Sequence, residues 1–91
     1  MSVVSKNTLI RNKLGLHARA ATKLAQLAMQ FDAEVSLFQG EKSAPANSVM
    51  GLLMLESSQG KEVRIEAKGK DAQAALDAIC QLIEDRFDES E

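Results

Sequence analysis

A short run of strict alternation in the second half of the chain constrains the fold most. Apolar and charged residues alternate there in the order Val63-Arg64-Ile65-Glu66-Ala67-Lys68. Successive side chains of a β-strand point to opposite faces, so this pattern predicts a strand with one apolar and one solvated face. Such a strand belongs to a sheet that is covered on one side only, and the chain must supply helices to cover that side.

Two longer segments have the three- and four-residue apolar spacing of amphipathic helices. The first helix is expected over residues 18–30, and its apolar face consists of Ala21, Leu24, Leu27, Ala28 and Phe31. The second is expected to begin after Asp71, a favourable capping residue. Its apolar stripe consists of Ala72, Ala75, Leu76, Ile79, Ile83 and Phe87, and an acidic tail follows.

Three further strands are expected. The β-branched residues of the segment 3–10 predict a strand, although its poor alternation leaves the inward face open. A second strand is expected around Val35 and Leu37, and a hairpin turn at residues 39–42 leads to a third. Pro45 lacks an amide donor, which places the third strand at an edge of the sheet.

A short helix between the third and fourth strands completes the pattern. Asn47 and Ser48 are both good N-cap residues for a helix over 49–55, which Gly51 weakens. The predicted fold class is α+β with the order βαββαβα. One four-stranded, mostly antiparallel sheet carries three helices on one face, and we expect a single domain over residues 1–91.

Charge and cysteine content narrow the function classes. The 91 residues include 11 basic and 13 acidic side chains, and no basic stripe could follow a nucleic-acid backbone, so we expect no nucleic-acid partner. No apolar run approaches the roughly 20 residues that span a bilayer, and the N-terminus lacks a signal-peptide pattern. One cysteine cannot form an internal disulfide. We therefore expect a cytoplasmic protein without membrane insertion.

The single histidine, His17, is the strongest candidate for chemistry. It lies where a turn containing Gly15 leads into the first helix, next to Ala18, Arg19 and Ala20. Amide groups at a helix start lack intrahelical acceptors and attract anions, phosphate in particular. The positive helix end disfavours a protonated imidazole and leaves a lone pair for nucleophilic attack. The same amides and the Arg19 guanidinium would then stabilise an attached phosphoryl group.

His17 also allows other interpretations. A lone histidine at a helix start is more often a capping or surface residue, and Arg19 shifts that balance only modestly. One histidine without nearby cysteines or a carboxylate cluster cannot supply the ligands of a metal site, so no metal is expected. A serine hydrolase is unsupported because no nucleophile elbow is present.

The segment Gly15-Leu16-His17-Ala18-Arg19-Ala20-Ala21 resembles the GLHxRPA signature of the HPr phosphocarriers. The resemblance extends over essentially the whole chain, including Ser48 before the second helix and Gly60 before the last strand. It implies the HPr-like open-faced β-sandwich. It also implies that His17 accepts a phosphoryl group from enzyme I, ultimately from phosphoenolpyruvate, and passes it to an enzyme IIA type protein. Arg19 would stabilise the phosphate, and the carrier would be a monomer that needs no cofactor and is not a stand-alone enzyme.

Three other features follow from the resemblance. Ala20 replaces the signature proline, which should loosen the first helical turn but could add an amide donor to the anion site. Ser48 matches a regulatory phosphorylation position of some HPr proteins, although helix capping alone explains it. Val49, Met50 and Leu53 lie in the helix that HPr proteins use to dock partners.

Two branches of the family remain open. The acidic Phe87-Asp88-Glu89 tail, Gly51 and the segment 31–35 look more like the nitrogen-related branch than the sugar-transport branch. A regulatory binding module of the same fold that transfers no phosphate is an alternative, which His17 disfavours. A ferredoxin-like ligand-sensing or metal-carrying domain is a further one, but the chain has no Cys-x-x-Cys pair and no Gly-rich loop. Cys80, on the apolar side of the last helix, is expected to be a buried structural thiol.

Overall fold

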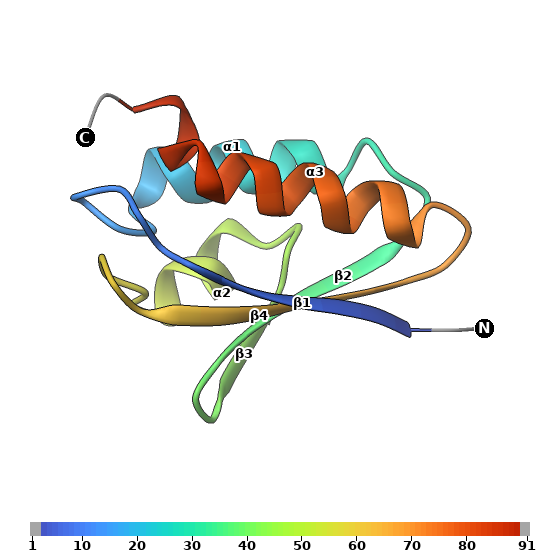
Figure 1. The fold of residues 1–91 in the computed structure, drawn as a ribbon, viewed down its shortest axis with the longest axis horizontal. Helices are drawn as coiled ribbons and strands as arrows, with labels where there is room; N and C mark the ends of the chain where they lie inside the picture. Colours follow the sequence, from blue (N-terminus) through green and yellow to red (C-terminus); the bar gives the residue numbers. More distant parts are fainter. Residues whose placement is uncertain (1–2, 90–91) are drawn as a thin grey trace.

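The computed structural model describes residues 3–89, in which four antiparallel strands form one sheet (Figure 1). The strands are β1 (Val3–Leu9), β2 (Glu34–Gln39), β3 (Lys42–Pro45) and β4 (Glu62–Lys68). Their order across the sheet is β1-β4-β2-β3, so β3 lies at an edge as Pro45 predicted. In the register, Val63 lies opposite Thr8 of β1, and Ile65 lies opposite Leu37 of β2.

Three helices cover one face of this sheet, as the alternation in β4 required (Figure 1). They are α1 (Ala18–Ala28), α2 (Val49–Met54) and α3 (Ala72–Glu84), and a 3-10 turn η1 (Arg86–Asp88) follows α3. Helices α1 and α3 pack side by side, while α2 contacts α1 and β3. The α+β prediction with order βαββαβα is therefore confirmed.

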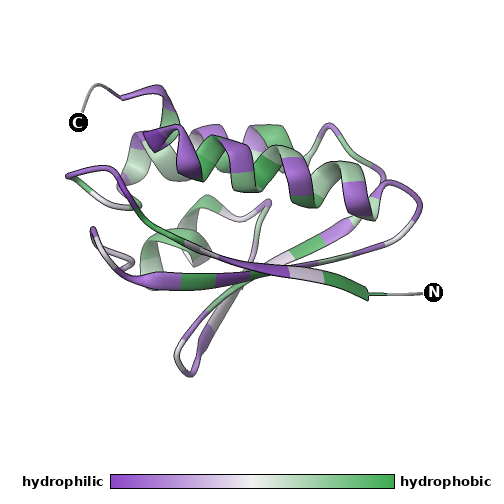
Figure 2. Ribbon diagram, viewed as in Figure 1, coloured by the Kyte–Doolittle hydropathy of each residue, from purple (hydrophilic) through white to green (hydrophobic). Residues whose placement is uncertain are grey.

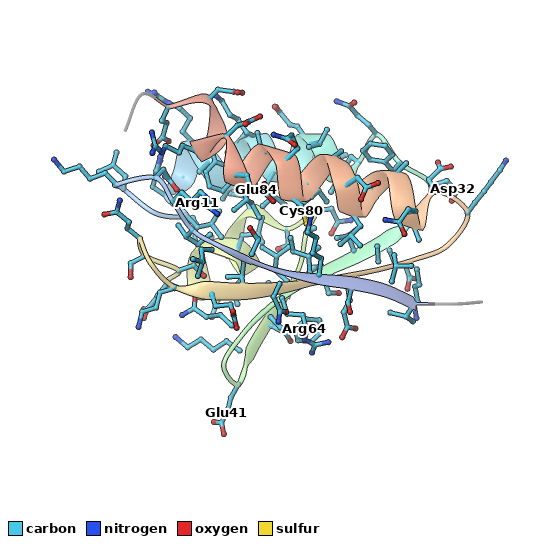
Figure 3. All side chains as sticks on the ribbon, in the orientation of Figure 1. Arg11, Asp32, Glu41, Arg64, Cys80 and Glu84 are labelled. Carbon is cyan, nitrogen blue, oxygen red and sulfur yellow. The ribbon has the colours of Figure 1, made fainter. Side chains whose placement is uncertain are left out.

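The two faces of the sheet differ as expected. Val63, Ile65 and Ala67 are at most 1% exposed and belong to the one core cluster under the helices. On the other face, the Arg64 guanidinium lies 4.3 Å from the centre of the Phe38 ring and pairs with the Glu66 carboxylate. Figure 2 shows the alternating hydropathy along β4, and Figure 3 places Arg64 and Cys80 on opposite sides of the sheet. Cys80 is 2% exposed, which confirms the prediction of a buried thiol.

The first helix ends two residues earlier than predicted. After Ala28, the amides of Gln30 and Phe31 donate to carbonyls only three residues back, which tightens the last turn and stops the α-helical pattern. Phe31 therefore lies beyond the helix, where it is half-buried against the core.

Two other boundary predictions and one capping prediction need correction. Strand β1 ends at Leu9, although Ile10 still bonds to the chain before β4 through Lys61 and Gly60. Asp71 is at the N-cap position of α3 but makes no capping bond, because its Oδ2 accepts from the Asp32 amide at 2.9 Å. Helix α3 ends at Glu84 and not at Phe87. Within residues 3–89, no helix is both long and apolar enough to cross a membrane.

Candidate functional site

The loop that carries the candidate histidine is held close to the segment before β4. Gly15 has φ +69°, and a Cβ atom at this position would lie 2.5 Å from the Ser57 carbonyl oxygen. The next amide, that of Leu16, donates to the same oxygen at 2.8 Å. Glycine is therefore required here both by its backbone conformation and by the close approach of two chain segments.

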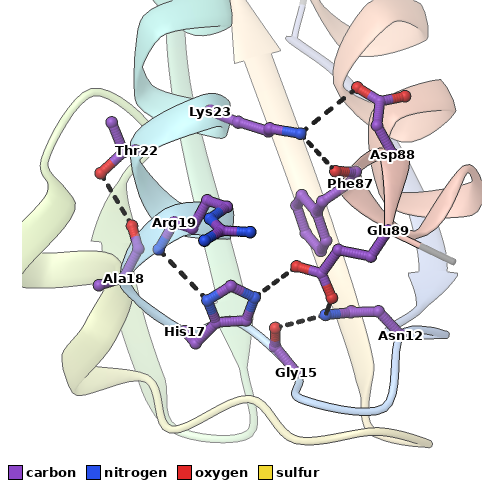
Figure 4. Close-up of polar contacts among 10 residues, drawn as sticks. All are labelled: Asn12, Gly15, His17, Ala18, Arg19, Thr22, Lys23, Phe87, Asp88 and Glu89. Atoms are coloured by element: carbon purple, nitrogen blue, oxygen red, sulfur yellow. Dashed lines mark hydrogen bonds and ion pairs between the residues drawn. The ribbon is translucent and has the colours of Figure 1, made fainter. Parts of the chain in front are cut away.

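His17 lies at the N-cap of α1, with an extended backbone and a half-buried side chain. Its Nδ1 accepts a hydrogen bond from the Arg19 amide at 3.2 Å (Figure 4). An imidazole nitrogen that accepts from an amide carries a lone pair and no proton. Nδ1 is therefore directed toward the positive end of α1.

The other ring nitrogen contacts the acidic tail. Nε2 of His17 forms a hydrogen bond with Oε2 of Glu89, 72 residues away in the sequence (Figure 4). A carboxylate accepts hydrogen bonds, so the neutral ring carries its proton on Nε2, in agreement with the unprotonated Nδ1. The two contacts together select one tautomer of His17.

Glu89 is held in place by a buried amide. Asn12 is fully buried, and its Nδ2 donates to the Gly15 carbonyl at 2.7 Å and to Glu89 Oε1 at 3.1 Å. The Gly15 carbonyl and the Glu89 carboxylate can only accept hydrogen bonds, which fixes the orientation of the Asn12 side-chain amide. Burial alone would raise the pKa of Glu89. The hydrogen bonds from His17 and Asn12, with the charge of Arg19 nearby, outweigh it and hold that pKa below its ordinary value.

The segment Asp85–Glu89, here called the C-terminal strap, brings Glu89 to the site. Three successive residues, Arg86, Phe87 and Asp88, have left-handed φ values of 53° to 64°. The Phe87 side chain is fully buried, and this burial, worth about 1.5–3 kcal/mol, offsets part of the roughly 1–2 kcal/mol that each of the three left-handed residues costs. Lys23 of α1 donates to the Phe87 carbonyl at 2.8 Å and lies 3.8 Å from the Asp88 carboxylate (Figure 4).

The structure brings the predicted helix-start residues together at one end of α1. Arg19 and Ala18 are exposed, and the Arg19 guanidinium makes no hydrogen bond or ion pair with another residue of the segment 3–89. Ala20 is fully buried, so its methyl group belongs to the core and not to the surface of the site. Over the described chain, no group of three or more His, Cys, Asp or Glu side chains is placed to hold a metal ion.

The predicted docking residues of α2 differ in exposure. Met50 is 70% exposed, whereas Val49 and Leu53 are half-buried and pack against the core. Met54, which the sequence analysis did not single out, is 68% exposed. Ser48 is the N-cap of α2, and its hydroxyl accepts from the Gly51 amide at 3.0 Å, so the capping role is confirmed.

Comparison with known proteins finds a family model, sequence relatives and solved structures that match this chain. A family model described as the PTS HPr component phosphorylation site matches residues 4–85. The chain is 59% identical to the phosphocarrier protein NPr of Shewanella violacea, with 99% of each chain covered, and 44% identical to the phosphocarrier protein HPr of Cupriavidus necator, with 98% and 100% covered. The crystal structure of HPr-C-His from Thermoanaerobacter tengcongensis superposes with a TM-score of 0.89 over all of both chains, at 37% identity.

The structure has one sheet covered by helices on one face, and its first helix begins at a partly exposed histidine. These features are those of a small α+β protein with a helix end that attracts anions. The family model and these relatives cover nearly the whole chain. The chain belongs to the HPr family of phosphocarriers, proteins that carry phosphate between partners.

Proposed function

We propose that His17 accepts a phosphoryl group on Nδ1 and later donates it to a second protein. The observation that carries this proposal is the orientation of the ring, because the unprotonated Nδ1 faces the start of α1, where among the described residues it accepts only from the Arg19 amide, while Nε2 bonds to the Glu89 carboxylate. In the transfer, Nδ1 forms a bond to phosphorus. The bond from phosphorus to the donor breaks, and its electron pair stays on the donor.

The surroundings of Nδ1 suit the attached group. The amides at the start of α1 have no intrahelical acceptors, so they can donate to phosphoryl oxygens once the Arg19 amide has released Nδ1. The exposed Arg19 guanidinium, which makes no hydrogen bond or ion pair within residues 3–89, can swing over the same oxygens. Arg19 and the amides of Ala18 and Ala20 would therefore hold the phosphate without a metal or cofactor.

The proposed partners are enzyme I, phosphorylated by phosphoenolpyruvate, as donor and an enzyme IIA type protein as acceptor, in the cytoplasm. The exposed Met50 in α2, with Val49 and Leu53 beside it, would form part of the docking surface. A flexible thioether surface suits a carrier that must bind two different partners in turn. The residues of the site all come from one chain, which supports a monomeric carrier.

The nitrogen-related branch is the proposed pathway. The chain is 59% identical to a protein named NPr and 44% identical to one named HPr, and this difference supports the assignment that the acidic tail suggested. Ser48 is a further candidate for phosphorylation, but its hydroxyl is half-buried and engaged in capping α2. We therefore propose that Ser48 serves the helix and is not a regulatory site in the resting protein.

The test is phosphorylation by enzyme I and phosphoenolpyruvate, followed by intact mass. Wild type should gain one acid-labile phosphate, and His17→Ala should gain none. Enzyme I from the nitrogen-related branch should act faster than enzyme I from the sugar branch at equal concentration. No phosphate on wild type with either enzyme would contradict the carrier role, and a regulatory binding module would then replace it. A faster reaction with the sugar-branch enzyme would contradict only the branch.

A further inference from the structure

We propose that Glu89 is a positioning residue for phosphoryl transfer: its carboxylate holds the proton on Nε2 of His17 and thereby keeps Nδ1 as the nucleophile. This inference rests on the proposed role of His17 as phosphoryl acceptor. Glu89 does not touch Nδ1, the nitrogen that would bear the phosphate, because its Oε2 is hydrogen-bonded to Nε2. It acts on the reacting atom through the ring.

Two neutral tautomers of a free imidazole compete, and only one of them can attack through Nδ1. In this site, the Arg19 amide requires an acceptor at Nδ1, and the Glu89 carboxylate requires a donor at Nε2. Both requirements select the same tautomer, so the ring is oriented before a partner arrives. Preorganisation of this kind removes the need to reorient the ring during the reaction.

The carboxylate also has an electrostatic role once the bond to phosphorus forms. When Nδ1 donates its electron pair while Nε2 keeps its proton, the ring acquires a positive charge. The Glu89 carboxylate lies directly against Nε2, with only 16% of its side chain exposed, and it balances that charge. When phosphorus leaves for the acceptor, the electron pair returns to Nδ1. Neither step requires a proton to move.

The fold fixes Glu89 from two sides, which distinguishes it from a mobile surface carboxylate. The fully buried Asn12 donates to Oε1, and the buried Phe87 ring anchors the strap two residues earlier. Lys23 holds the strap to α1 through the Phe87 carbonyl. A charged tail with no such role would not need a buried amide and a buried ring to hold one of its carboxylates on the histidine.

Glu89→Gln removes the charge but keeps nearly the same shape. Its amide presents one oxygen and one nitrogen to two donors, so one of the contacts to Asn12 and His17 becomes donor against donor. Asp88→Asn is the matched control, because it removes the same charge one residue earlier, where the 68% exposed side chain faces Lys23 and not the ring.

Two measurements test the proposal. The ¹⁵N chemical shifts of the His17 ring should report an Nε2–H tautomer in wild type and Asp88→Asn, and a mixture with Nδ1–H in Glu89→Gln. In single-turnover phosphorylation by phosphorylated enzyme I, Glu89→Gln should slow the rate at saturation by about ten- to a hundredfold. The concentration of phosphorylated enzyme I that gives half the maximal rate should change less than about twofold, since docking is unaffected.

An unchanged tautomer and rate in Glu89→Gln would overturn the proposal, and so would an equal loss of rate in Asp88→Asn, which would reflect general charge. A change in half-saturation alone would also overturn it, because that result assigns Glu89 to docking. If wild type accepts no phosphate, the proposed function fails, and the ring shifts alone then decide whether Glu89 positions His17.

Discussion

Replacing Gly15 by alanine tests how closely the histidine loop must approach the segment before β4. An alanine at φ +69° costs about 1–2 kcal/mol for the left-handed backbone alone. The new Cβ would also lie 2.5 Å from the Ser57 carbonyl oxygen, which is a backbone atom and cannot rotate away. The two segments must separate, which weakens the Leu16 to Ser57 hydrogen bond, worth about 0.5–1.5 kcal/mol.

Together these terms predict that Gly15→Ala lowers the free energy of unfolding by about 1.5–3.5 kcal/mol. Gly40→Ala is the matched control, since Gly40 has φ +57° and nothing within 4 Å of the position of a new Cβ. It should lose only about 1–2 kcal/mol. The gain from restricting the unfolded chain is the same in both variants and cancels in the comparison.

Urea unfolding followed by circular dichroism measures both variants. For a domain of this size, the extra loss of about 0.5–1.5 kcal/mol in Gly15→Ala corresponds, in a thermal melt, to a melting temperature roughly 2–12 °C below that of Gly40→Ala. Phosphoryl acceptance by His17 should fall as well in Gly15→Ala, because the loop carries the ring. Equal stability of the two variants would contradict this prediction, since it would mean that the loop moves away from Ser57 at no cost.

Three further predictions concern other parts of the chain. Ser48→Ala should lose about 1 kcal/mol in urea unfolding through the missing bond to Gly51, whereas Ser48→Asp should retain most of the stability; equal losses would argue against capping. Burial raises the pKa of the Cys80 thiol, so a disulfide reagent at pH 8 should label it at least about a hundredfold more slowly in the native protein than in urea; equal rates would contradict its burial. The ionised form of Glu89, whose pKa is lowered by His17, Asn12 and Arg19 despite its burial, should stabilise the fold above its ordinary pKa of 4.5. The stability difference between wild type and Glu89→Gln should therefore shrink as the pH falls below that value; a constant difference from pH 7 to 3 would contradict the contact.

The sequence predicted the elements whose apolar pattern is local. The alternation in β4 and the spacing in α1 depend only on neighbouring residues, so both elements and the buried face of β4 could be predicted. The buried face of α1 was predicted in part, because it also includes Ala20 and Ala25. Strand β1 has no clear alternation, and its inward face became visible only in the structure, where Thr8 is buried and Val4, on the same face of the strand, is partly buried. The predicted end of α3 was wrong because the buried Phe87 continues the helical spacing of apolar residues, although the backbone has already left the helix.

The site was predicted only in part for a similar reason. His17 and Arg19 share a short motif at a helix start, a signal that the sequence carries directly. The contact between His17 and Glu89 joins residues 72 positions apart, and nothing local distinguishes Glu89 from a solvated acidic tail. Asn12 is equally unmarked, because its importance comes from burial beside Gly15 and Glu89. Long-range contacts such as these depend on the tertiary packing of the strap.

The most direct test of the account is to locate the phosphate on the protein by ³¹P and ¹⁵N NMR after phosphorylation by enzyme I and phosphoenolpyruvate. The spectra should show one phosphorus nucleus coupled to Nδ1 of His17, with Nε2 free of phosphorus. Phosphate on Nε2 would contradict the orientation of the ring by Glu89 and Arg19. Phosphate on a residue other than His17 would contradict the assignment of the site itself.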